Sequence, residues 1–452
     1  MMPPSSGFFD RHQFSGKHMQ QPLLKMTLAL WIFALSGCGG GGSDTGTGNG
    51  GAGGNTSENQ PTPPTNLPIK IKGLVAGSRI SSGDQHSALI AMAGQIHSWG
   101  NNQHGQRGTG SFLLSDSITP PSVVSISGMP LTELATGSAS TLALDNNGSI
   151  WSWGLNEHGQ LGVDSLTYEF NTPQRIAAMP GRVTRIAARS ANGMALNDKG
   201  ELFAWGWNGW GQIGDGTKSA TIGRVGDKLK PALVKTGPLG TASIVDIAQG
   251  WATAALLDSA GRIWTWGYNE HGEIGNGTGG RGEYELLPRL ADTSALADAH
   301  AINIEFGRYH GLALDSTGRL WSWGWNNVGQ LGTGKISDSK SIEQVQLPER
   351  ITTLAAGAQH SLALDTKGTL WAWGQNDFYQ LGDGTRIDRR LPVRVDLSAL
   401  GGREIVALSA GDDFSMVLDD SGRVWGWGNN LRAQVGNTAR AYFKSPVFVL
   451  EK

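Results

Sequence analysis

The sequence has little of three things on which many folds depend. It contains one cysteine, Cys38, so no disulfide can form within the chain. It has no apolar run of the roughly 20 residues that a membrane-spanning helix needs, and the run at residues 26–35 is ten residues long. The formal net charge is −2 and becomes −4 without residues 1–37, which hold three basic side chains and one acidic one. A cationic nucleic-acid surface is therefore not expected.

The short apolar run has the features of an export signal. Lys25 precedes it, and Leu35-Ser36-Gly37-Cys38 follows it directly. This order is typical of a signal peptide, and the last four residues resemble the lipobox of bacterial lipoproteins, in which the cysteine thiol receives diacylglycerol. We expect residues 1–37, or residues 19–37 if translation starts at Met19, to be a signal peptide and Cys38 to be lipidated. The alternative is a buried core segment with an incidental cysteine.

The segment after Cys38 cannot bury a core. Residues 39–66 consist mainly of glycine, serine, threonine, asparagine and proline, a composition typical of flexible linkers. We therefore expect residues 38–66 to tether a folded domain, residues 67–452, to a membrane through the lipid alone. The protein would then be exported, in the periplasm or on the outer surface.

Glycine and tryptophan are abundant, with 67 and 17 residues, and much of both belongs to an internal repeat. A block of the form W-x-W-G-x-N-x-x-G-Q-L-G recurs seven times, with spacings of 54, 52, 61, 57, 50 and 54 residues. Its second aromatic position is always tryptophan: Trp99, Trp153, Trp205, Trp266, Trp323, Trp373 and Trp427. Alternating apolar residues and a glycine turn precede each block, so each period holds about four short strands. This pattern predicts an all-β, seven-bladed β-propeller.

Together with G-x-x-H-S-L-A-L upstream, the block resembles the repeat of the regulator-of-chromosome-condensation (RCC1) family, over residues 73–452. The resemblance implies about four antiparallel strands in each of seven blades. Arg189 departs from the pattern, because the other six repeats have glycine there. The family histidine is present as His86, His310 and His360. We expect each to satisfy backbone groups inside its own blade and to bind no metal, since the three are spread around a ring.

Two terminal segments have the alternating pattern of a blade strand that could close the ring. One is Pro446-Val447-Phe448-Val449 and the other is Pro68-Ile69-Lys70-Ile71. We favour the C-terminal segment as the strand that completes the first blade, because the RCC1 family usually joins its two ends in one blade.

No catalytic or cofactor motif is complete in this chain. Residues 329–336 approach a P-loop, but Ile336 stands where Mg²⁺ binding needs serine or threonine, and the stretch is a copy of the repeated block. The G-x-S-x-G elbow of hydrolases does not occur. We expect no enzymatic activity, no cofactor and no metal.

Six aromatic residues follow the Trp-Gly pairs, in loops that should emerge on one face of the propeller. They are Trp207, Trp210, Tyr268, Trp325, Phe378 and Tyr379. Aromatic side chains dominate the binding energy of protein interfaces, so these six could form a partner-binding face. They could equally cover neighbouring blades, and the sequence leaves both interpretations open.

These observations predict a monomeric interaction module of the cell envelope that binds a protein or a glycan. Secreted relatives of this repeat class act by binding other proteins. The alternative is guanine-nucleotide exchange on a small GTPase, the activity of the family's eukaryotic founder. Residues 163–185 are too short for the β-wedge insertion between blades two and three, and the basic N-terminal tail is absent. An enzyme with a site in the central channel is a third possibility, but the sequence nominates no residues for it.

Overall fold

The computed structural model describes residues 80–91, 94–112, 122–124, 126, 130–220, 225–439 and 441–451. They belong to a compact unit of residues Leu67–Lys452. The predictions for residues 1–66, including Cys38, fall outside the described residues, as does the segment at 68–71. Within the described ranges, no helix is both long and apolar enough to cross a bilayer.

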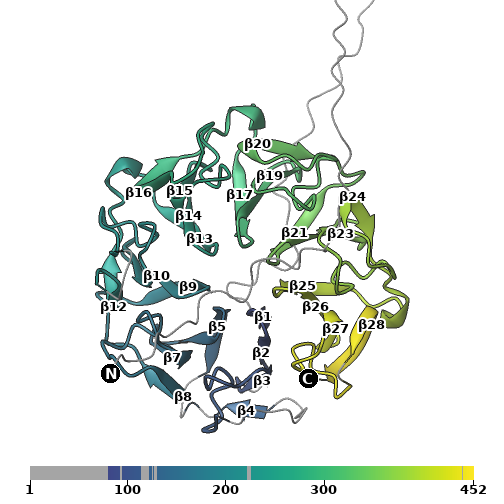
Figure 1. Ribbon diagram of the computed structural model, residues 1–452, viewed down its shortest axis with the longest axis horizontal. Helices are drawn as coiled ribbons and strands as arrows, with labels where there is room; N and C mark the ends of the chain where they lie inside the picture. Colours follow the sequence, from purple (N-terminus) through teal and green to yellow (C-terminus); the bar gives the residue numbers. More distant parts are fainter. Residues whose placement is uncertain are drawn as a thin grey trace, which may run out of the picture. The chain divides into compact units, whose positions relative to one another are not determined.

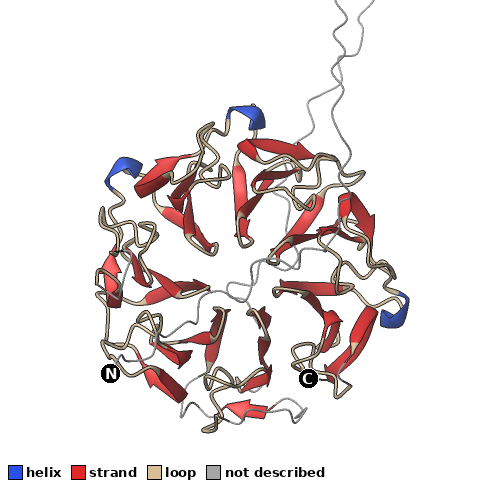
Figure 2. Cartoon of the chain, in the orientation of Figure 1, coloured by secondary structure: helices blue, strands red, loops and turns tan. Residues whose placement is uncertain are grey.

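Seven four-stranded antiparallel sheets stand around a common centre (Figures 1 and 2), and each consists of four strands that are consecutive in the chain. The first strand of each sheet lies nearest the centre and the fourth lies at the periphery (Figure 1). The predicted seven-bladed β-propeller is therefore confirmed, and the blades are numbered one to seven in chain order.

The strands are grouped here by their position in the blade. The inner strands are β1 (Ile80–Ser82), β5 (Leu131–Thr136), β9 (Val183–Arg189), β13 (Ile244–Gln249), β17 (Ala301–Phe306), β21 (Ile351–Ala356) and β25 (Ile405–Ala410). The second strands are β2 (His86–Ile90), β6 (Ser140–Asp145), β10 (Asn192–Asn197), β14 (Thr253–Asp258), β18 (His310–Asp315), β22 (His360–Asp365) and β26 (Phe414–Asp419). The third strands are β3 (Ile96–Gly100), β7 (Ile150–Leu155), β11 (Leu202–Gly206), β15 (Ile263–Tyr268), β19 (Leu320–Gly324), β23 (Leu370–Gly374) and β27 (Arg423–Asn429). The outer strands are β4 (Ser122–Val124), β8 (Glu169–Arg175), β12 (Lys228–Leu233), β16 (Tyr284–Leu290), β20 (Ser339–Val345), β24 (Arg389–Arg394) and β28 (Tyr442–Glu451). Three short 3₁₀ helices, η1 (Gly237–Leu239), η2 (Ser294–Leu296) and η3 (Ser398–Leu400), follow outer strands.

The hairpin between the second and third strands explains why aspartate, glycine and tryptophan recur at fixed spacing in the repeat. In blade six, Asp365 ends β22 and its Oδ1 accepts the backbone N–H groups of Lys367 and Thr369, both at 2.9 Å. Its Oδ2 accepts the indole N–H of Trp371 at 2.9 Å. Gly368 has a φ of 79°, which a residue with a side chain rarely adopts. Aspartate and glycine at these positions therefore set the turn that pairs β22 with β23.

The repeated tryptophans hold one blade to the next. All seven are fully buried, and each indole Nε1 donates to a backbone carbonyl of the preceding blade at 2.9–3.0 Å. The acceptor is always the glutamine or glutamate of the G-Q-L-G segment. The bonds run from Trp99 to Gln434, Trp153 to Gln106, Trp205 to Gln160, Trp266 to Gln212, Trp323 to Glu273, Trp373 to Gln330 and Trp427 to Gln380. Gly332 shows why glycine ends this segment, since a Cβ there would lie 2.7 Å from Nε1 of Trp373.

The repeat histidines also act between blades. Each Nε2 lies 2.9–3.0 Å from a hydroxyl of the next blade. The pairs are His86 with Thr141, His310 with Ser361, and His360 with Ser415. The prediction that these side chains bond inside their own blades is therefore wrong, because the edge of each imidazole faces the neighbouring sheet. Burial lowers their pKa values to about 4, 3 and 3 respectively, so all three are neutral near pH 7.

Among the described strands, none is shared between the two ends of the chain to close the ring. β28 pairs with β27 in blade seven, with Phe448 opposite Trp425, and blade one has its own outer strand, β4. The prediction that the C-terminal segment completes blade one is wrong, because the free edge of β27 takes the segment that follows it, as in every other blade. The seam between blades seven and one instead uses side chains. Ser82 Oγ lies 2.9 Å from Ser409 Oγ, and Ser87 Oγ and Trp99 Nε1 both donate to Gln434.

Candidate partner-binding face

Each blade presents the same three backbone positions on one face of the ring. Two are the turn residues before the second strand, and the third is the residue after the Trp-Gly pair. A backbone bond ties the third position to the turn, and in blade five the N–H of Trp325 donates to the Tyr309 carbonyl at 2.9 Å. The same bond recurs in the other blades, from Asn101 to Gln85, Leu155 to Ala139, Trp207 to Ala191, Tyr268 to Ala252, Gln375 to Gln359 and Asn429 to Asp413. The backbone is thus constant while the side chains differ.

In blades three to five these positions carry aromatic residues that touch one another. We call Trp207, Trp251, Tyr268, Tyr309 and Trp325 the aromatic platform. Tyr309 is its centre, with ring centroids 5.4 Å from Trp251, 5.7 Å from Tyr268 and 5.4 Å from Trp325. Trp207 extends the cluster through Trp251 at 5.1 Å. All five side chains are half-buried, so the platform keeps an accessible surface.

The structure separates the six aromatic residues that the sequence put forward. Trp207, Tyr268 and Trp325 belong to the platform. Trp210 and Phe378 share a different repeat position and pack against the outer strand of the next blade. Their ring centroids lie 6.2 Å from Tyr284 and 5.5 Å from Tyr442, respectively.

In other blades, the residue at the repeat position of Trp210 and Phe378 connects its blade to the next one. Three other blades place a histidine there, whose Nδ1 lies 2.8–2.9 Å from a carboxylate of the following blade. These pairs are His104 with Glu169, His158 with Asp227, and His271 with Asp338. Trp210 and Phe378 therefore cover neighbouring blades, although Trp210 also touches the platform at Tyr268, with centroids 4.9 Å apart.

Tyr379 lies apart from the platform. Its φ is 65°, and the equivalent residue is glycine in blades one to five. Its ring lies 5.7 Å from the guanidinium carbon of Arg386, which is also 5.7 Å from the ring of Tyr442. The arrangement is a local cation–π contact at the junction of blades six and seven.

The same turn positions carry charge in blades five, seven and one. We call Asp84, Asp412 and Asp413 the acidic arc. Arg308 reaches it from blade five, with Nη2 3.4 Å from Asp412 Oδ2. Burial, and next the neighbouring Asp412, raise the pKa values of Asp84 and Asp413 to about 7. Negative charge is therefore crowded at this side of the channel mouth.

Arg189 crosses the channel below the mouth. Its side chain leaves blade three and donates from Nη1 to the Ala356 carbonyl of blade six at 3.0 Å. Burial lowers the pKa of Arg189, whereas the carboxylates of Asp412, Asp84 and Glu305 act to raise it. The one repeat that replaces glycine with arginine thus connects non-adjacent blades.

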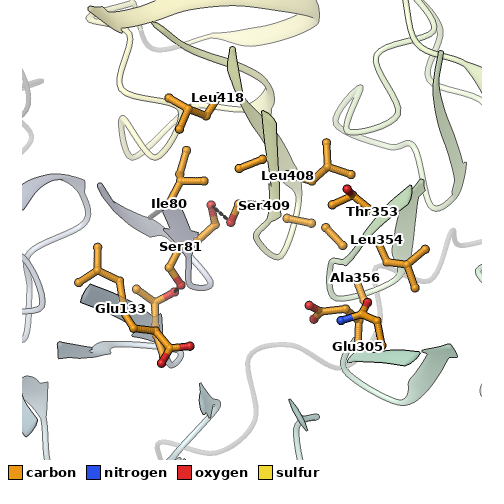
Figure 3. A pocket seen from close by; sticks show the side chains of 18 of the residues that line it. Ile80, Ser81, Glu133, Glu305, Thr353, Leu354, Ala356, Leu408, Ser409 and Leu418 are labelled. Atoms are coloured by element: carbon orange, nitrogen blue, oxygen red, sulfur yellow. Dashed lines mark hydrogen bonds between the residues drawn. The ribbon is translucent and has the colours of Figure 1, made fainter. Parts of the chain in front are cut away.

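The inner strands enclose a central cavity of about 860 Å³ (Figure 3). Glu133 and Glu305 lie in its wall, on β5 and β17. Glu305 stands out, because burial raises its pKa to about 8 and the equivalent residues of the other blades are alanine or serine. Among the described residues no group of three histidine, cysteine, aspartate or glutamate side chains is placed to hold a metal ion.

Sequence reasoning missed two features of this face. Tyr309 and Trp251 were not among the six aromatic residues put forward, because those six follow the Trp-Gly pairs and these two lie upstream of them. The available signal was the pair of residues between the repeat glycine and the repeat histidine, which is Ser-Ala in blades two and three and differs in each of the other blades. The contact of Arg308 with Asp412 had no sequence signal, since 104 residues separate them.

Comparison with known families matches the chain to one family in several places. A model of the RCC1-like domain matches residues 217–451. Models of the regulator of chromosome condensation (RCC1) repeat match residues 147–196 and, separately, residues 78–106 and 132–160.

Curated relatives share about 30% of residues with part of the chain. The ultraviolet-B receptor UVR8 of Arabidopsis thaliana is 31% identical over 272 residues, 60% of this chain and 58% of UVR8. The E3 ubiquitin-protein ligase HERC2 of Homo sapiens is 30% identical over 284 residues, 62% of this chain and 6% of HERC2. The Xenopus laevis protein RCC2 homolog is 28% identical over 280 residues, 59% of this chain and 53% of that protein. The chain thus matches less than two thirds of the length of each.

Solved structures match the propeller at lower identity. The crystal structure of human WBSCR16 has a TM-score of 0.69 and 19% identity, and the match covers 79% of this chain and 94% of that one. Prp20p from Saccharomyces cerevisiae has a TM-score of 0.68 and 23% identity, and the match covers 82% and 88%. These likenesses concern the fold alone.

Proposed function

Because the chain belongs to the RCC1-like repeat family, we propose that it is an interaction module that binds a protein partner. Its seven blades share one strand arrangement, whereas the sequences of their turns vary. The aromatic platform carries this proposal. Five half-buried aromatic side chains from three blades form one patch on a rigid support. Rigid aromatic side chains lose little entropy on binding and are enriched among interface hot spots. A glycan, which also stacks on aromatic rings, is the alternative occupant.

We further propose that the module is exported and held at a membrane of the cell envelope by a lipid on Cys38. The apolar run at 26–35 and the lipobox-like residues 35–38 support this. One lipid-modified terminus suits a protein whose remaining chain has no apolar segment long enough to cross a bilayer.

The anchor is tested by cell fractionation of the native chain beside the variant Cys38→Ala. The native protein is expected in the membrane fraction, with a diacylated cysteine at the N-terminus of its first peptide by mass spectrometry. The variant is expected to leave the membrane fraction, because no thiol remains to carry lipid. Cytosolic protein that retains residues 19–37 would contradict export.

The binding face is tested by replacing Trp325 with the photo-crosslinking residue p-benzoylphenylalanine in the native host. We expect an adduct with one reproducible partner, because Trp325 belongs to the aromatic platform and a bound partner would contact it. Gln375 is the matched control, since it occupies the same repeat position in blade six and makes the same backbone bond. Few or no adducts are expected from it.

Equal crosslinking from Trp325 and Gln375, or none from either, would contradict the platform as the binding face. An adduct with a glycan would favour the alternative occupant. An adduct with a small GTPase would favour the alternative function, guanine-nucleotide exchange, which otherwise stays a prediction from the family resemblance.

A further inference from the structure

The aromatic platform and the acidic arc form one continuous surface around the channel mouth. Arg308 connects them, because it precedes Tyr309 of the platform and contacts Asp412 of the arc at 3.4 Å. The backbone N–H of Trp251 also donates to the Arg308 carbonyl at 3.0 Å. A partner that lies across this mouth would therefore meet aromatic rings on one side and carboxylates on the other.

The platform does not have the geometry of a cation cage. A cation held between two aromatic rings lies within about 6 Å of both centroids, so opposed rings stand well apart. Here the four contacts between platform rings have centroid distances of only 5.1–5.7 Å, with edge or tilted packing. The rings fill the space between themselves and leave an outer surface, which suits a large apolar side chain.

The acidic arc holds three carboxyl groups beside two guanidinium groups, those of Arg308, which pairs with Asp412, and of Arg189, which donates to Ala356. Burial and the neighbouring Asp412 raise the pKa values of Asp84 and Asp413 to about 7, so a further cation would stabilise their ionised forms. Asp84, Asp412 and Asp413 are all half-buried, so they remain within reach of a bound group. A cation placed there would offset the repulsion among the carboxylates, whereas a phosphate backbone would be repelled.

We propose that the face recognises a polypeptide segment in which lysine or arginine adjoins one or two large apolar residues. The apolar residues lie on the platform and the basic group lies against the arc. This inference rests on the proposed function and specifies the chemistry of the partner. A neutral sugar would use the platform and leave the arc unmatched, and a small amine would not span blades three to one.

The probe is a library of random twelve-residue peptides displayed on phage and selected against the full chain. We expect enriched peptides to contain lysine or arginine within a few positions of tryptophan, phenylalanine, leucine or methionine. A synthetic copy of the best peptide is expected to bind at one site. Replacing its basic residue with norleucine should weaken binding about tenfold, a test that needs no change in the protein.

Protein variants then separate the two parts of the surface. Trp251→Ala is expected to weaken the peptide more than tenfold, and Asp412→Asn with Asp413→Asn about tenfold. The matched controls are Gln375→Ala and Asp377→Asn in blade six, which should leave affinity within twofold. Thermal melting confirms that each variant is folded.

Three outcomes would overturn this inference. They are enrichment of peptides without basic residues, affinity that is unchanged by the Asp412 and Asp413 substitutions, and selection of nothing while the chain self-associates through this face. Photo-crosslinking at Trp325 to a protein without a basic contact segment would sustain the proposed function while rejecting the peptide chemistry. Loss of both the crosslink and the peptide would reject the two together.

Discussion

A disulfide between blades seven and one, introduced by Ser82→Cys with Ser409→Cys, is expected to raise the free energy of unfolding by up to about 5 kcal/mol. The two hydroxyl oxygens lie 2.9 Å apart and the residues are 327 positions apart in sequence. A crosslink over so long a loop removes much of the entropy of the unfolded chain. Chemical denaturation under oxidising and reducing conditions measures the gain.

The matched control is Ser81→Cys with Thr136→Cys, between blades one and two. Those oxygens lie 2.8 Å apart, but only 55 positions separate the residues. The expected gain is smaller by about 1.6 kcal/mol, because the loop is shorter. Both variants carry Cys38→Ala, so that the native thiol cannot mispair. The prediction assumes that the interface between blades seven and one is packed like the other interblade interfaces. A disulfide that forms completely there without raising the free energy of unfolding would contradict this.

The contribution of the three buried histidines to the free energy of unfolding is expected to fall as the pH is lowered. Their folded pKa values are about 4, 3 and 3, below the ordinary value of 6.5. Below pH 6.5 the histidines of the unfolded chain take up protons that the buried histidines of the folded chain do not. Their contribution to the free energy of unfolding therefore decreases as the pH is lowered from 6.5 toward 4. Each fully buried histidine contributes about 1.4 kcal/mol per pH unit in that window.

The measurement compares unfolding free energy at pH 7.0 and 5.5 for the native chain and for His310→Phe with His360→Phe. Phenylalanine suits this position, because Phe414 occupies it in blade seven and is fully buried. The carboxyl groups of Asp84, Glu133, Glu273, Glu305 and Asp413 have pKa values raised to about 7 or 8, so their contribution to stability grows as pH falls, in the opposite sense. Because both proteins retain these acids, the difference between them isolates the histidines. Identical pH slopes would contradict neutral, buried imidazoles.

The repeat made the fold predictable, but not the way the ring closes. Seven copies of one block specify seven blades, because each copy brings its own turn glycine, hairpin and interblade tryptophan. The segment at Pro446 has the alternating pattern of an outer strand, and that pattern is the same whether it pairs in blade seven or in blade one. The strand with which it pairs depends on which strand edge lies free beside it in the folded ring. The sequence of the segment itself does not specify this.

The arrangement of the proposed binding face was only partly predictable, for a similar reason. Trp207, Tyr268 and Trp325 occupy one repeat position, so aligning the repeats brings them together. Tyr309 and Trp251 join them from a different position, and this juxtaposition depends on how the inner turns sit beside the third strands. Arg189 was visible as a substitution for glycine, but its bond to Ala356 depends on the diameter of the channel.

The unbroken strand order of the seven described sheets has a consequence for how the chain assembles. Every blade consists of four strands in unbroken order, so each sheet is complete as soon as its own stretch of chain emerges. No early sheet has to wait, with an unpaired edge, for the last residues to arrive. Unpaired edges invite pairing with other chains, so this order limits association between incomplete molecules. The last step joins two finished surfaces, as in the docking of two subunits.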